Sequence, residues 1–152
     1  METAQYRHRL LWHGVFLFLV GLLTGFAVPL LTNPRMGLSA HLEGVVNGLF
    51  LLVLGLIWER LILSARPRLF LFWLAIYGAY ANWFTTILAA ILGTSRRTPI
   101  AGVGFKGQAW QENLIDVGLI SLAFAMVAAC VIALWGLRRP TISTQTEKQR
   151  QA

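Results

Sequence analysis

The sequence predicts an all-α membrane protein in which four transmembrane helices form a bundle, with both termini in the cytoplasm. Three observations predict it. Hydrophobic residues make up 57% of the 152 residues and charged residues only 12%. A soluble domain carries roughly a quarter charged residues, so much of the polar surface that keeps such a domain in solution is missing. The apolar residues also fall into four long runs, and basic residues flank these runs.

Each apolar run is long enough to cross the bilayer, which takes about 20 helical residues. We expect helices at about 10–31, 42–63, 69–92 and 114–137. Only helices and closed barrels satisfy every backbone group in lipid, and continuous runs of this length are helical. Asn33-Pro34, Arg66-Pro67 and the glycine-rich segment 93–107 separate the runs. Residues 1–139 therefore form one transmembrane domain, and the polar segment 140–152 is expected to be a disordered tail.

The distribution of basic residues predicts the orientation. One side of the membrane would hold nine: Arg7, Arg9, Arg60, Arg66, Arg68, Arg138, Arg139, Lys148 and Arg150. The other would hold four: Arg35, Arg96, Arg97 and Lys106. Because cytoplasmic loops carry the excess of Lys and Arg, both termini are placed in the cytoplasm of a bacterial-type inner membrane. The net charge of +7 is thus interpreted as anchoring at a lipid surface rather than as nucleic-acid binding.

Polar residues at membrane depth are costly, so their positions indicate where a site could lie. The predicted topology places them in the outer half of the bilayer, and they are His41, Glu43, Asn47, Asn82, Thr86, Gln111, Glu112 and Asp116. The cytoplasmic half has few such groups. We therefore expect one shared pocket with the third loop as its lid. Two glycine pairs at four-residue spacing, Gly21–Gly25 and Gly44–Gly48, would let neighbouring helices approach closely.

Each of these residues also has a purely structural explanation. His41, His8 and His13 could be interfacial histidines. First-turn carboxylates such as Glu112 are favoured by the helix dipole, and Asn82 could make a hydrogen bond between helices. Aromatic residues near a pocket often only pack, and an aromatic belt at the membrane surface explains Trp12, Trp58, Trp73 and Trp135.

Several polar blocks resemble the hydroxylaminobenzene mutase family. They are His41-Leu-Glu-Gly-Val-Val-Asn-Gly48, Tyr77-Gly-Ala-Tyr-Ala-Asn-Trp83, Pro99-Ile-Ala-Gly-Val-Gly104 and Gln111-Glu112. They occur in the family's order, and the resemblance spans residues from about 13 to 137. It implies a membrane isomerase that converts hydroxylaminobenzene to 2-aminophenol, an enzymatic counterpart of the Bamberger rearrangement and a step of nitroaromatic degradation.

A second resemblance is to styrene oxide isomerase, a membrane enzyme with four helices. That family binds haem b in a homotrimer and uses ferric iron as a Lewis acid on the epoxide oxygen. Its axial histidine begins the second helix and is followed six residues later by Asn-Gly, a spacing that His41, Asn47 and Gly48 reproduce. Gly78 replaces an acidic residue of that family and Thr86 a functional tyrosine, so haem binding carries over better than the epoxide chemistry.

Together the resemblances imply a haem-dependent arylhydroxylamine mutase, and they imply a role for each candidate residue. His41 would ligate the iron, and Glu43 or a group on a neighbouring helix could orient its imidazole. Asn47 and Asn82 would hold the substrate, and Glu112 or Asp116 would handle the proton that leaves the ortho carbon. The aromatic side chains of Tyr77, Tyr80 and Trp83 would stack on the ring or the porphyrin.

Three other functions are alternatives to a mutase. An epoxide isomerase like styrene oxide isomerase would use the same cofactor. A non-catalytic haem subunit would need a second axial histidine, and only His41 is predicted in the outer half. A transporter would need a polar path through both leaflets, which the apolar cytoplasmic half does not offer.

Overall fold

The computed structural model describes residues 3–138, and these residues form four long helices without any strand. Helix α1 spans Thr3–Ala27, α2 Pro34–Ile57, α3 Ala65–Leu92 and α4 Ala109–Gly136. The single-turn helices η1 (Val28–Leu30) and η2 (Trp58–Arg60) follow α1 and α2. All four long helices are long and apolar enough to cross a membrane. The predicted all-α transmembrane bundle is therefore confirmed. The tail predicted at 140–152 lies outside the described residues.

All four helices begin several residues before the bounds predicted from hydropathy. The second was expected from residue 42, but α2 begins at Pro34, where Asn33 caps the helix. The Asn33 side chain accepts the backbone N–H groups of Arg35 and Met36, and proline fits the first helical position because it needs no N–H partner there. Helix α4 begins at Ala109 rather than near 114, with Gln108 and Gln111 forming a capping box. Because the first turns of these helices are polar, a hydropathy window places their starts too late in the sequence.

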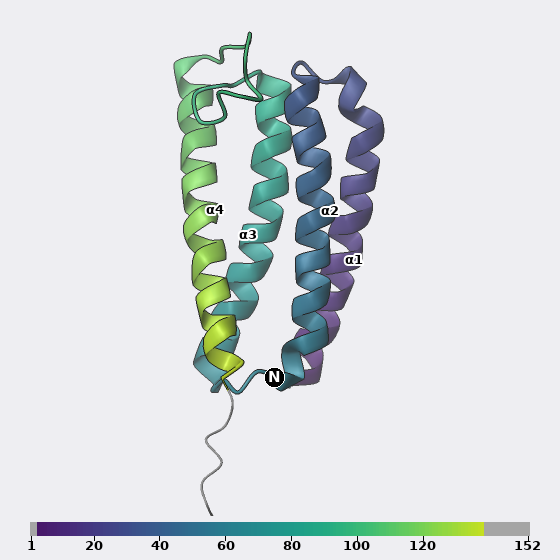
Figure 1. Ribbon diagram of the computed structural model, residues 1–152, viewed down its shortest axis with the longest axis vertical. Coiled ribbons are helices and arrows are strands. Elements are labelled where there is room, and N and C mark those ends of the chain that lie inside the picture. Colours follow the sequence, from purple (N-terminus) through teal and green to yellow (C-terminus); the bar gives the residue numbers. More distant parts are fainter. Residues whose placement is uncertain (1–2, 139–152) are drawn as a thin grey trace, which may run out of the picture.

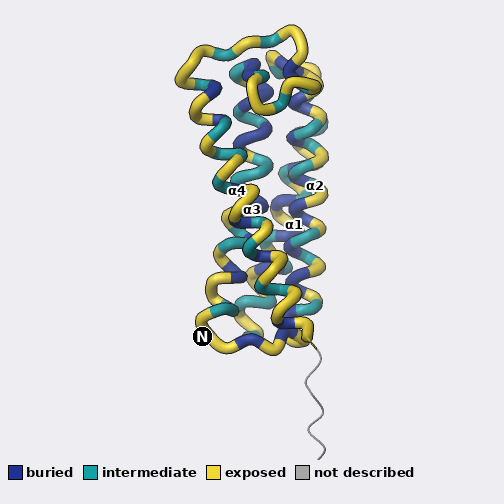
Figure 2. The backbone as a smooth tube through the Cα atoms, turned by 60° about the vertical axis from the view of Figure 1, so that its left-hand side comes forward, coloured by how far each residue is buried: buried dark blue, intermediate teal, exposed yellow. Residues whose placement is uncertain are grey.

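The helices stand in a row rather than in a closed square (Figure 1). Helix α1 packs on α2, α2 on α3 and α3 on α4, so α1 and α4 are the two outer helices of the row. Burial follows from this row, because the inner helices α2 and α3 carry more buried positions than the outer helices α1 and α4 (Figure 2). We call the end with the η1 turn and the 93–108 loop the loop end. The opposite end, where α1 begins and α4 ends, is the terminal end (Figure 1).

The main apolar core lies between the first three helices towards the terminal end. Trp58, Leu10 and Leu71 are fully buried there, and the ring of Tyr6 packs between Trp58 and Phe72. Trp58 is therefore a core residue and not part of an aromatic belt. Trp12, Trp73 and Trp135 keep about half of their surface exposed, as a belt requires.

Candidate functional site

Helices α1 and α2 approach so closely that no side chain fits between them. A Cβ atom added to Gly44 would lie 2.5 Å from the Cα atom of Gly21, and one added to Gly48 would lie 2.6 Å from the backbone nitrogen of Phe18. Glycine is therefore required at both crossing points. The predicted role of the Gly44–Gly48 pair is confirmed. Gly21 is the matching residue on α1.

This close approach brings a backbone carbonyl of α1 to the imidazole of His41. The Nδ1 atom of His41 lies 2.8 Å from the Gly21 oxygen. A carbonyl only accepts, so Nδ1 carries the proton and Nε2 keeps its lone pair. Gly25 faces the same ring, since a Cβ atom there would lie 2.9 Å from Nδ1. His41 is thus held in the tautomer that can ligate a metal through Nε2. Of the two expected ways to orient this imidazole, the structure shows the group on a neighbouring helix, the Gly21 carbonyl, rather than Glu43.

Glu43 instead joins the two asparagines at a depth of about 15 Å below the loop end, counted at 1.5 Å per residue. The Asn82 amide donates to Oε2 of Glu43 over 2.6 Å, which links α3 to α2. The Asn47 amide donates to the same oxygen over 3.0 Å and to the Glu43 backbone oxygen over 2.8 Å. Asn47 is buried, and Glu43 and Asn82 are partly buried. We call Glu43, Asn47 and Asn82 the amide–carboxylate cluster.

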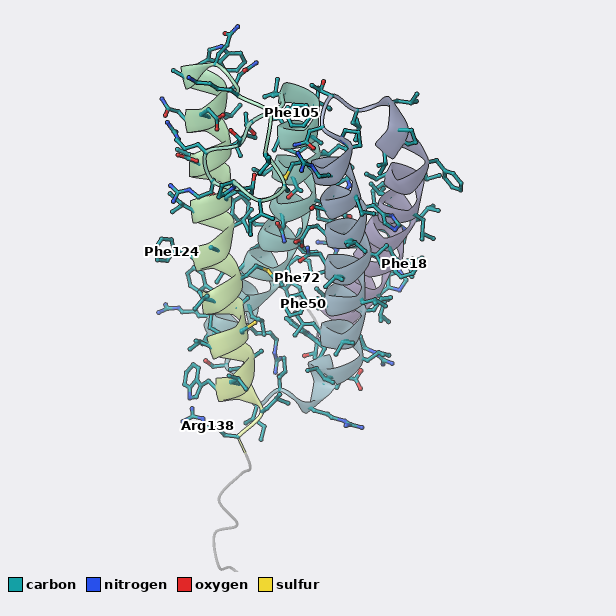
Figure 3. All side chains as sticks on the ribbon, turned by 45° about the horizontal axis from the view of Figure 1, so that its top comes forward. Phe18, Phe50, Phe72, Phe105, Phe124 and Arg138 are labelled. Carbon is teal, nitrogen blue, oxygen red and sulfur yellow. The ribbon has the colours of Figure 1, made fainter. Side chains whose placement is uncertain are left out.

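An apolar groove lies between α2 and α4. The groove holds about 270 Å³ and is lined by Phe50, Val53, Leu54 and Ile57 of α2 and by Cys130, Ala133, Leu134 and Leu137 of α4. Phe50 extends between these helices, whereas Phe124 points away from the bundle (Figure 3). On α2, Glu43, Asn47, Phe50 and Leu54 follow a helical spacing of four, three and four residues, so they share one face.

The three aromatic residues expected to stack on a ligand contact other side chains. Tyr80 lies 3.0 Å from Nδ1 of His13 through its hydroxyl, and the two rings meet edge to face. The indole N–H of Trp83 donates to Thr24 over 3.0 Å. Tyr77 is exposed and lies 2.7 Å from the Ser121 hydroxyl. Their predicted stacking remains a prediction, but each ring already has a partner on another helix.

Glu112 and Asp116, at the start of α4, face the 93–108 loop. Glu112 is buried, and its carboxylate accepts the backbone N–H groups of Ser95, Arg96 and Gly107 at 3.0–3.4 Å. Asp116 forms ion pairs with Arg96 at 2.6 Å and Arg97 at 3.3 Å. The sequence predicted a single shared pocket, but the structure separates these residues into two polar groups. One consists of His41 and the amide–carboxylate cluster, and the other consists of Glu112 and Asp116, which hold the 93–108 loop.

We predict that Glu112→Gln loosens the loop without unfolding the helices. A glutamine amide nitrogen cannot accept an N–H, so at least one backbone donor loses its partner, which costs about 1–3 kcal/mol locally. Limited trypsin digestion should then cleave after Arg96 and Arg97 several-fold faster. Glu59→Gln is the matched control, because Glu59 pairs with Arg7 at the terminal end. Equal cleavage rates for both variants would contradict the assignment.

Sequence reasoning missed three residues of the site. Gly21 acts through its backbone, which a residue pattern does not reveal. Thr24 lies on the same face of α1 three residues later, and its polarity within an apolar run was a usable signal. His13 was placed at the membrane surface, but it lies ten residues into α1 and contacts Tyr80 of α3. The described residues contain no group of three or more His, Cys, Asp and Glu side chains that could hold a metal ion.

Comparisons with known proteins identify the family of this chain. A family model described as styrene oxide isomerase matches residues 6–138. The chain is 51% identical to hydroxylaminobenzene mutase HabB of Ectopseudomonas oleovorans over 95% of this chain and 88% of that protein. It is 44% identical to hydroxylaminobenzene mutase HabA of the same organism over 83% of this chain and 94% of that protein. No solved structure matches the chain at a significant level. The chain therefore belongs to the family of membrane isomerases that includes the hydroxylaminobenzene mutases.

Proposed function

We propose that this isomerase converts hydroxylaminobenzene to 2-aminophenol in the membrane, with haem b as its cofactor. The likeness to two hydroxylaminobenzene mutases over most of the chain carries the substrate assignment. The hydrogen bond from His41 to Gly21 supports the cofactor, because it leaves Nε2 free to bind iron.

The residues around His41 fit such a group. Its imidazole is oriented by the Gly21 carbonyl, as a ligand to iron would require, and the absence of a side chain on Gly25 leaves room for the imidazole ring. When bound, ferric haem supplies a Lewis acid for the hydroxyl oxygen of the substrate. The large apolar surface around His41, which includes the exposed Leu38 and Leu42, suits a flat hydrophobic cofactor.

The reaction is an isomerisation and needs no oxidant or reductant. The N–O bond breaks with its electron pair leaving on oxygen, a C–O bond forms at the ortho carbon, and the proton on that carbon is lost as nitrogen gains one. Asn47 and Asn82 hold the hydroxylamine group. We assign the removal of the ring proton to Glu43, which lies against both amides, because Glu112 and Asp116 are engaged by the loop.

The substrate would reach the cluster from the bilayer. Small aromatic hydroxylamines partition into lipid, and the groove between α2 and α4 is lined only by apolar side chains and Cys130. Such a groove offers a path from the hydrocarbon region to the cluster. We further propose a homotrimer in a bacterial inner membrane with both termini in the cytoplasm, as the resemblance and the charge distribution imply.

Epoxide isomerisation is the second candidate, since the matching family model is that of styrene oxide isomerase. A non-catalytic haem subunit fits less well, because it would need two histidines at one level. His13 lies eight residues before Gly21, the partner of His41, on the same helix. At 1.5 Å per residue the two levels differ by about 12 Å, too far for both imidazoles to ligate one iron.

The assay that tests the reaction uses protein purified in detergent from cells supplied with haem. Hydroxylaminobenzene should be converted to 2-aminophenol, identified by chromatography against the authentic compound. Styrene oxide in a parallel incubation tests the second candidate. Hydroxylaminobenzene returned unchanged, beside conversion of the epoxide, would reverse the assignment.

A further inference from the structure

We propose that the amide–carboxylate cluster selects its ligand by hydrogen-bond donors, and that Glu43 is the residue that fixes this preference. The inference deepens the proposed function and rests on it, because it explains why an arylhydroxylamine would be preferred over an epoxide. Three hydrogen bonds fix the orientation of the side chains in this cluster.

Both side-chain amides turn their NH2 groups to the same carboxylate oxygen. A carboxylate accepts and does not donate, so Asn47 and Asn82 must each present nitrogen to Oε2 and carbonyl oxygen elsewhere. The second bond of Asn47, to the Glu43 backbone oxygen, enforces the same orientation. Without a carboxylate at position 43, the Asn82 amide could rotate by half a turn and offer a donor instead.

The atoms left over are all acceptors. From the described residues, no hydrogen bond reaches Oε1 of Glu43 or Oδ1 of either asparagine. These three oxygens sit on two helices within one cluster, and the surrounding helix surface is apolar. A ligand that enters gains hydrogen bonds only by bringing N–H or O–H groups. A buried carboxylate oxygen that stays unpaired beside a ligand is costly.

This chemistry separates the two candidate substrates. A hydroxylamine carries one N–H and one O–H donor beside the aromatic ring. An epoxide carries a single oxygen acceptor and no donor, so it would face three acceptors with nothing to give them. Sites built to bond a polar group reject an analogue that lacks it far more strongly than apolar pockets reject a change in size.

The inference is tested by binding rather than turnover. N-benzylhydroxylamine carries both donors, but its nitrogen is not attached to the ring, so it does not undergo the rearrangement. Its Kd is measured by calorimetry beside those of its O-methyl and N-methyl derivatives, which each lack one donor, and of styrene oxide, which lacks both. A ring-methylated N-benzylhydroxylamine controls for added size. We expect each lost donor to weaken binding several-fold, and ring methylation to change it little.

Glu43→Gln then tests the residue itself. The glutamine oxygen can keep both amide bonds, so its NH2 group takes the place of Oε1 and adds a donor to the cluster. Binding of N-benzylhydroxylamine should weaken about tenfold or more, while styrene oxide binds as well as before or better. Glu59→Gln at the terminal end is the control and should bind all five ligands like the wild type.

The outcomes separate this inference from the proposed function. Wild-type protein that binds styrene oxide as tightly as N-benzylhydroxylamine overturns the inference, even if Glu43→Gln does not fold. If Glu43→Gln folds and still prefers N-benzylhydroxylamine over styrene oxide as the wild type does, the role assigned to Glu43 is overturned. Neither result bears on whether the wild-type protein converts hydroxylaminobenzene, which is what tests the proposed function. Conversely, the binding affinity could fall with each lost donor while the wild-type protein fails to convert hydroxylaminobenzene. That result would support the inference and contradict the proposed function.

Discussion

His41→Ala is expected to yield a folded membrane protein without a Soret band and without mutase activity. The variant removes the only side chain assigned to the iron and leaves the α1–α2 glycine contact in place. Loss of several kcal/mol of charge stabilisation on the departing oxygen should lower the rate by about 100-fold or more. The absorption spectrum of protein from haem-supplied cells, followed by the activity assay, measures both effects.

The two other histidines supply the controls. His8 is exposed near the terminal end, so His8→Ala should keep the band. His13→Ala removes the partner of Tyr80 and should also keep it. External imidazole should restore part of the band in His41→Ala by occupying the vacated position. A band that persists in His41→Ala but disappears in His13→Ala would move the cofactor site to the other histidine.

Gly44→Val is expected to have the largest effect on stability. Its Cβ atom would lie 2.5 Å from the Gly21 Cα atom, and backbone on both sides cannot yield as a side chain can. Helices α1 and α2 would separate, at a cost of about 3 kcal/mol or more in the free energy of unfolding. The separation would also pull the Gly21 carbonyl away from His41, so bound haem should fall together with the melting temperature.

Gly55→Ala is the matched control on the same helix. Its added Cβ atom would meet side-chain atoms of Leu11 and Leu10 at 3.0–3.2 Å, and these can shift. Thermal unfolding in detergent should therefore show a small change for Gly55→Ala and a large one for Gly44→Val. Similar melting temperatures for the two variants would contradict the required close approach.

The sequence alone predicted the helices because hydropathy depends on composition over a long window. It misplaced their starts because caps such as Asn33 and Gln108 are polar and local. The close contact at Gly44 and Gly48 was predictable from their spacing, since small residues four apart on a membrane helix typically let another helix approach closely.

The arrangement of the site was predicted less well. Residues that share a level in the membrane need not share a neighbour, and sequence gives only the level. Glu112 was grouped with Asn82, but the loop turns its backbone N–H groups to Glu112 and takes it out of reach. Likewise, the sequence left open whether Glu43 or a group on a neighbouring helix orients His41, because the α1 group that does so is a backbone carbonyl, which no residue type encodes.

The peripheral position of α4 has a consequence for the order in which the chain enters the membrane. His41, Glu43, Asn47 and Asn82 all find their hydrogen-bond partners within α1, α2 and α3. Once the third helix has been inserted, none of these groups has to wait for α4 to escape the lipid. The last helix, mostly apolar and mostly exposed, can then dock on α3 and be fastened by the loop through Glu112. Biogenesis can thus complete the costly polar part first and the membrane-facing wall afterwards.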